Sequence, residues 1–106
     1  ILLIEARDGG GPAEYFDWIE DLQAGTMEKR LREHFTVPGY IFLLNCEQAK
    51  RYNILMLSSV APEVVAPMGL KSYDTVEKLM AAADLTGKSI YVIPNGSTVV
   101  PYVKGV

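Results

Sequence analysis

Residues 1–12 read ILLIEARDGGGP, and this stretch decides the fold. Its first four residues, Ile1-Leu2-Leu3-Ile4, are all apolar, which is typical of a parallel strand covered by helices on both faces. Three glycines follow Asp8, and Pro12 stands where a helix can begin, because its missing N–H costs nothing at the first helical position. Strand, glycine turn and helix together predict the first half of a βαβ unit.

The rest of the chain repeats this alternation of strands and helices. Further strands are predicted at Asn53–Ser59 and Lys88–Ile93, with a short edge strand at Leu70–Tyr73. Helices are predicted over residues 12–22, 26–35, 40–52, 62–67 and 74–83, the last starting with a capping-box pattern at Asp74 and Glu77. The order predicts one three-layer, Rossmann-like α/β domain over residues 1–106. Its mostly parallel sheet has about four strands in the order 3-2-1-4, and the strands at 1–6, 54–58 and 89–93 are expected to be buried.

Composition excludes several classes of partner. A net charge of −3 argues against nucleic acid and against an anionic membrane surface. No apolar run approaches the roughly 20 residues that a membrane-spanning helix needs. The single cysteine, Cys46, cannot form an internal disulfide and fits a reducing, cytoplasmic compartment.

The carboxyl ends of the predicted strands are the expected place for a ligand, because open α/β sheets bind ligands there. We expect Arg7 to meet a carboxylate, since it is the one cation at a strand end. The full set of predicted substrate-binding residues is Arg7, Asp8, Gly10, Tyr40, Asn95 and Ser97. Turns require the same residue types, however, and spacing alone favours that structural role.

No motif for a known catalytic or metal centre is present. Gly9-Gly10-Gly11 is neither a dinucleotide-binding G-x-G-x-x-G pattern nor a P-loop. His34 and Cys46 are the sole residues of their types, so the chain offers no metal-ligand cluster and no Cys/His or Ser/His/Asp arrangement. No catalytic or metal-binding residue is therefore predicted.

Three stretches together resemble the carboxyl-terminal domain of the nickel-pincer-dependent lactate racemase family. They are the strand and turn at Ile4–Gly11, the glycine-led helix start at Pro38–Leu44, and the sequence Val92–Pro101, which is similar to the family's terminal Pro-Asp-Gly-Ser pattern. Each stretch alone is a weak signal. Their order and spacing over nearly the whole chain carry the resemblance.

The resemblance implies a two-domain enzyme that interconverts 2-hydroxy acid stereoisomers by hydride transfer to a nickel-pincer nucleotide. The cofactor and the catalytic residues belong to the family's amino-terminal domain. The implied partners of this chain are therefore that domain and a small 2-hydroxy acid, and the implied role is closure over the substrate, with no cofactor of its own and no activity alone. Three departures put lactate itself in doubt: Tyr40-Ile41 replaces the end of a Gly-Gly-His-Lys helix start, Asn95 replaces Asp, and Ala6 replaces Cys.

Two questions stay open at this point. The chain opens within a predicted strand and without an initiator Met, which favours a carboxyl-terminal domain of a longer protein over a trimmed terminus. The alternative to the racemase-like role is a non-enzymatic α/β binding or interaction module that uses the same sheet edge. An upstream domain with a lysine and a histidine cluster would favour the racemase.

Overall fold

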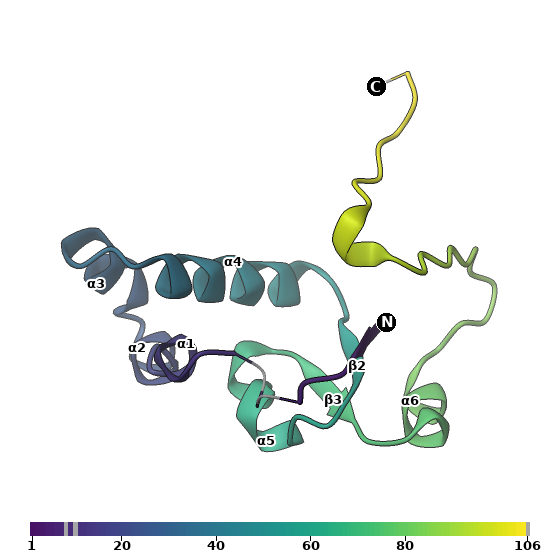
Figure 1. The fold of residues 1–106 in the computed structure, drawn as a ribbon, viewed down its shortest axis with the longest axis horizontal. Helices are drawn as coiled ribbons and strands as arrows, with labels where there is room; N and C mark the ends of the chain where they lie inside the picture. Colours follow the sequence, from purple (N-terminus) through teal and green to yellow (C-terminus); the bar gives the residue numbers. More distant parts are fainter. Residues whose placement is uncertain (8, 10, 106) are drawn as a thin grey trace.

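The protein is an α/β domain built on a three-stranded, all-parallel sheet (Figure 1). The computed structural model describes residues 1–7, 9 and 11–105. The strands are β1 (Leu2–Ile4), β2 (Leu55–Ser58) and β3 (Lys71–Tyr73). The α-helices are α1 (Ala13–Phe16), α2 (Ile19–Ala24), α3 (Met27–Glu33), α4 (Val37–Arg51), α5 (Pro62–Val65) and α6 (Val76–Ala82), with 3-10 turns η1 (Ala66–Met68) and η2 (Gly96–Thr98).

The sheet has the order β1-β2-β3, with Leu3 opposite Leu57 and Leu57 opposite Tyr73. This confirms the parallel direction and the relative order of the first three predicted strands. The predicted fourth strand is wrong: Lys88–Ile93 belongs to no ladder of the described chain, and residues 89–93, which were expected to be buried, are exposed. The observed order is therefore 1-2-3 in place of 3-2-1-4.

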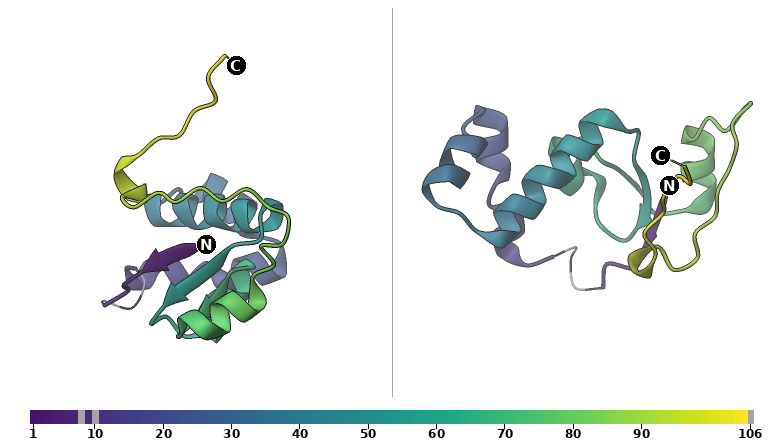
Figure 2. Two further views of the ribbon diagram at one scale, coloured as in Figure 1. Left: turned by 90° about the vertical axis from the view of Figure 1, so that its right-hand side faces the viewer. Right: turned by 90° about the horizontal axis from the view of Figure 1, so that it is seen from above.

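Helices lie on both faces of the sheet. Figure 2 shows α4 and the elements around it on one side of the strands and α6 on the other. α6 packs mainly on β2 and β3. Because β1 is an edge strand, its apolar run is exposed, with 45%, 76% and 41% of Leu2, Leu3 and Ile4 accessible. The expectation of a strand buried on both faces is correct for β2, where Leu55 and Met56 are buried, and wrong for β1.

The main hydrophobic core lies among the helices and away from the sheet. Trp18, Phe42 and Cys46 are its most deeply buried members, and Met27, Leu31 and Met68 complete it. Trp18 sits at the break between α1 and α2, where one continuous helix was predicted. Its indole ring packs against the backbone of Gly39 so closely that a Cβ on Gly39 would lie 2.4 Å from ring carbons.

Side-chain caps set the starts of α4 and α6. The hydroxyl of Thr36 accepts a hydrogen bond from the Gly39 N–H, so α4 begins at Val37 and three residues earlier than predicted. The hydroxyl of Thr75 accepts from the Lys78 N–H and caps α6. The capping residue of α6 is thus Thr75, and Asp74, which was predicted for that role, is left for another contact. Of the helices described, none combines the length and the apolar character that crossing a membrane would take.

Candidate functional site

The carboxyl ends of the three strands meet at one edge of the sheet, which we call the carboxyl edge. In the register, Ile4 lies opposite Ser58, and Leu57 lies opposite Tyr73. The residues that follow each strand therefore lie at the same edge: Glu5 to Arg7 after β1, Ser59 and Val60 after β2, and Asp74 after β3. This is the position at which parallel sheets commonly bind ligands.

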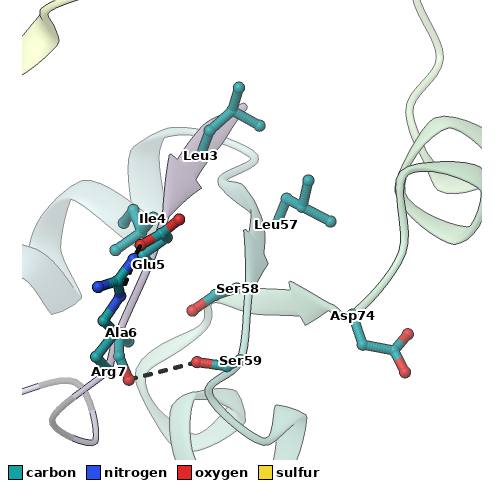
Figure 3. A pocket seen from close by; sticks show the side chains of 9 residues that line it. All are labelled: Leu3, Ile4, Glu5, Ala6, Arg7, Leu57, Ser58, Ser59 and Asp74. Carbon is teal, nitrogen blue, oxygen red and sulfur yellow. Dashed lines mark hydrogen bonds and ion pairs between the residues drawn. The ribbon is translucent and has the colours of Figure 1, made fainter.

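The first hollow of the carboxyl edge opens between β1 and β2 and has a volume of about 560 Å³. Figure 3 shows the Arg7 guanidinium folded back onto the Glu5 carboxylate at its rim, and the hydroxyls of Ser58 and Ser59 turned toward the β1 side. The Arg7 Nη2 to Glu5 Oε2 distance is 2.7 Å, and both side chains are more than three-quarters exposed. Exposed ion pairs are worth only about 0–1 kcal/mol, so an incoming carboxylate can replace Glu5 at low cost.

The serine hydroxyls hold the backbone that shapes this hollow. Ser59 Oγ donates to the Ala6 carbonyl oxygen at 3.3 Å and ties the turn after β2 to the segment after β1. The buried Ser58 Oγ accepts from the Val60 N–H at 3.2 Å, and the buried Ser72 Oγ donates to the Val60 carbonyl at 2.7 Å. Ser59 is the exposed member of the three, and its oxygen keeps lone pairs for a ligand.

A second hollow of about 620 Å³ continues the carboxyl edge from β2 to β3, and it shares Ser58, Ser59 and Asp74 with the first. Lys78 Nζ lies 2.7 Å from Asp74 Oδ1 at its rim. The hydrogen bond from Lys78 lowers the pKa of the Asp74 carboxyl below its ordinary value. Asp74 is therefore ionised and paired near neutral pH, which is unsuited to a general acid.

The structure does not bring the predicted site residues together in one hollow. Arg7 lines the first hollow as predicted. Tyr40 stands in the first turn of α4 and packs on Phe35, with ring centroids 5.9 Å apart. Asn95 and Ser97 lie at η2, which Figure 2 shows on the side to which the strands point, displaced from them toward α4. None of these three residues lines either hollow of the carboxyl edge.

Two predicted site residues, Asp8 and Gly10, lie outside the described residues. The separation of Tyr40, Asn95 and Ser97 from Arg7 has two causes. α4 runs so that its first turn lies beside α3 and away from the sheet (Figure 1). The segment that was expected to be the fourth strand does not pair, so no strand ladder holds Asn95 and Ser97 against the two hollows of the carboxyl edge.

Sequence reasoning missed Asp74 and Lys78 as parts of this edge. Leu70–Tyr73 was identified as a short strand, and the rule that ligand sites follow strand ends applies equally to Asp74. The capping-box pattern gave Asp74 a competing role, which the structure assigns to Thr75.

A third hollow, of about 310 Å³, lies on the opposite side of β1 and was also missed. Apolar side chains such as Ile4, Phe16 and Met56 line it. Asn45 Nδ2 donates to Tyr15 Oη at 2.6 Å there, and burial raises the pKa of the Tyr15 hydroxyl. The two partners are 30 residues apart, and no sequence pattern signals their contact.

The carboxyl edge does not fit a nickel ion or its pincer nucleotide. Nickel sites in proteins draw on imidazole and thiolate donors. The edge offers hydroxyls, carboxylates and cations, whereas Cys46 is buried in the helical core and His34 ends α3. Burial raises the pKa of the Cys46 thiol to about 11, so it is not a thiolate near neutral pH. Within residues 1–7, 9 and 11–105, no group of three or more His, Cys, Asp or Glu side chains is placed to hold a metal ion.

Comparisons with known proteins give no family for the chain. No family profile matches it, and neither a curated protein nor a solved structure is similar enough to count as a match.

Proposed function

We propose that this chain is the substrate-closing domain of a lactate racemase-like enzyme that interconverts 2-hydroxy acid stereoisomers. In this proposal an amino-terminal domain of the same protein holds the nickel-pincer nucleotide and the catalytic residues, and the cofactor supplies the hydride acceptor. The chain itself contributes binding and orientation. The proposal rests on the resemblance of residues 4–11, 38–44 and 92–101 to that family and on the chemistry of the carboxyl edge.

The main support for the proposal is that Arg7 lies beside the Ser59 hydroxyl at the carboxyl edge. The ion-pair partner of Arg7, Glu5, can be replaced by the carboxylate of a ligand. Arg7 is held by the exposed Glu5, and the neighbouring Ser59 hydroxyl bonds the Ala6 carbonyl between them. A guanidinium binds a carboxylate through two parallel hydrogen bonds, which fixes the plane of the carboxylate. A 2-hydroxy acid carries its carboxylate and hydroxyl on adjacent carbons, so a cation beside a hydroxyl matches both groups.

Orientation is the contribution that such a surface makes to hydride transfer. The α-carbon of the substrate must present one face to the acceptor, and fixing the carboxylate and the hydroxyl fixes that face. The first hollow is open to solvent, as a surface must be if a second domain is to close over it (Figure 3). Full affinity then requires both domains, and the isolated chain is expected to bind 2-hydroxy acids weakly.

The test is an NMR titration of ¹⁵N-labelled residues 1–106 with D-lactate, L-lactate and 2-hydroxybutyrate. We expect amide shifts at Glu5, Arg7 and Ser59, and their loss in Arg7→Ala. Arg32→Ala is the matched control, because Arg32 forms an equally exposed ion pair with Glu28 at 2.6 Å on α3, away from the edge. Shifts that persist in Arg7→Ala, or that map to the third hollow, would contradict the proposal.

A further inference from the structure

β1 is an open edge of the sheet. β2 pairs with one of its sides, and no other strand of the described chain pairs with the opposite side. The side chains of β1 are between 41% and 76% exposed. An apolar strand with unpaired N–H and C=O groups is a template for the addition of another strand.

The same chain carries an unused strand, Ile90-Tyr91-Val92-Ile93, which we call the tail segment. Its residues are β-branched or aromatic, which favours a strand. They are 63%, 88%, 82% and 48% exposed, and no ladder of the described residues includes them. The segment leaves the body after the turn at 85–88, where the Lys88 N–H donates to the Leu85 carbonyl and Gly87 has a φ of +68°. Figure 2 shows it passing outside the sheet.

We propose that the tail segment of one copy adds to the open edge of β1 in a second copy, and that the exchange is reciprocal. Each copy presents an unfilled strand edge and an unpaired apolar strand at the same time. A two-fold symmetric pair satisfies both needs in both copies, and the turn at 85–88 is the hinge of the exchange. Exchange of an identical element needs no new surface, because the contacts are those of an ordinary sheet.

The direction of the added strand connects this exchange to the carboxyl edge. Parallel addition places residues 90–93 beside residues 1–4, so the chain that follows runs past Glu5 to Arg7. Asn95 and Ser97 of the second copy then reach the carboxyl edge, beside Arg7 and Ser59. The exchange thereby brings Asn95 and Ser97 of one copy together with Arg7 and Ser59 of the other, which a single copy does not do. This part of the inference rests on the proposed function.

The surface involved is that of a small interface, which gives a weak, concentration-dependent pair. The tail segment and residues 1–4 bring eight large apolar side chains from each copy. Fully burying one such side chain removes roughly 60–120 Å² from water, from its transfer free energy at 25 cal/mol per Å². The sixteen side chains of the pair are already partly covered, and even half of that area gives about 500–1,000 Å² before the backbone is counted, close to the roughly 1,000 Å² of a specific interface.

The test uses two separately purified variants of residues 1–106, Leu3→Cys and Val92→Cys, mixed and oxidised. Leu3 and Val92 face each other in the parallel register, and the native Cys46 is buried and does not compete. We expect a disulfide-linked heterodimer on a non-reducing gel in most of the protein. Leu3→Cys mixed with Val103→Cys is the matched control, since Val103 is equally exposed in the tail but outside the tail segment, and it should give at least tenfold less.

Further pairs of cysteine variants show in which direction the added strand runs and whether it comes from a second copy. Glu5→Cys with Pro94→Cys cross-links only in the parallel arrangement, and Ile1→Cys with Pro94→Cys only in the antiparallel one.

A double variant that carries Leu3→Cys and Val92→Cys in one chain should form the dimer. If the double variant closes on itself as a monomer, the exchange is overturned. It is also overturned if neither the Glu5→Cys with Pro94→Cys mixture nor the Ile1→Cys with Pro94→Cys mixture cross-links. An antiparallel result would overturn the completed site and leave the exchange standing. None of these readouts needs a ligand, so failure of lactate binding refutes the proposed function without affecting them.

Discussion

The helical core and the sheet use their apolar residues in opposite ways. In the helical core, Trp18, Phe42 and Cys46 are at most 2% exposed and in mutual contact through the cluster that joins α2, α3, α4 and η1. In the sheet, β1 leaves Leu2, Leu3 and Ile4 open to solvent, and its carboxyl edge is lined by exposed polar groups. The difference teaches that stability and recognition are carried by separate regions. The helices hold the fold together, which leaves the sheet edge available to a ligand or another strand.

The largest effect should follow from emptying the helical core. Phe42 is fully buried and packs its ring edge against Tyr15, with centroids 5.2 Å apart. Phe42→Ala should lower the free energy of unfolding by about 3–5 kcal/mol, since it removes buried surface and leaves a cavity. Phe35→Ala, at a Phe that is 64% exposed, should cost about 1 kcal/mol or less. Urea unfolding followed by circular dichroism measures both. Equal losses would show that the core is not where stability resides.

Overfilling the same core should have the next largest effect. An added methyl group at Gly39 would lie 2.4 Å from the Trp18 ring, which is held between the α4 backbone and the Arg30 guanidinium at 4.3 Å. Gly39→Ala should therefore lower the free energy of unfolding by about 1–3 kcal/mol, despite the better helix propensity of Ala. Gly96→Ala is the control, because nothing lies within 4 Å of a Cβ there. A Gly39→Ala protein as stable as the parent would refute the close contact.

A smaller and pH-dependent effect should come from Asp21 at the rim of the helical core. Its carboxylate pairs with Arg30 and accepts a hydrogen bond from the Thr26 hydroxyl at 3.1 Å. The hydrogen bond from Arg30, more than any other contact, lowers the pKa of Asp21 below its ordinary value. Because the folded pKa is the lower one, the stabilisation is complete above about pH 4, the unfolded value, and disappears as the pH falls through the folded value.

Asp21→Asn should therefore be less stable than the parent at pH 7, and the difference should shrink as the pH falls below about 4 through the folded pKa of Asp21. Chemical unfolding at a series of pH values gives both curves. Glu5→Gln, which alters the exposed pair with Arg7 at the carboxyl edge, should change stability little at any pH. If Glu5→Gln gave the larger pH-dependent loss, the assignment of stability to the helices would be reversed.

The sequence predicted some elements and misled on others for identifiable physical reasons. β1, β2 and residues 90–93 show nearly the same apolar run, yet β2 is a buried strand, β1 an exposed edge and 90–93 no strand at all. Periodicity reports which residues can form a strand, and neighbours in space decide whether they are covered. Arg7 could be placed at the carboxyl edge because it comes three residues after the end of β1. The predicted position of Asn95 and Ser97 required a fourth strand pairing, which did not form. The contact of Trp18 with Gly39 joins two separate segments, and no local sequence pattern predicts it.

The burial of Cys46 gives this protein a built-in measure of how often its helical core opens. A thiol reacts as its thiolate, and the pKa of this one is raised to about 11 inside a core where it is 1% exposed. A thiol reagent can modify it only during an opening that separates α4 from its neighbours. The labelling rate then reports the population of that open state, in the manner of amide hydrogen exchange. Movements of the tail segment or of the carboxyl edge leave this rate unchanged, so one cysteine separates fluctuations of the two regions without any added probe.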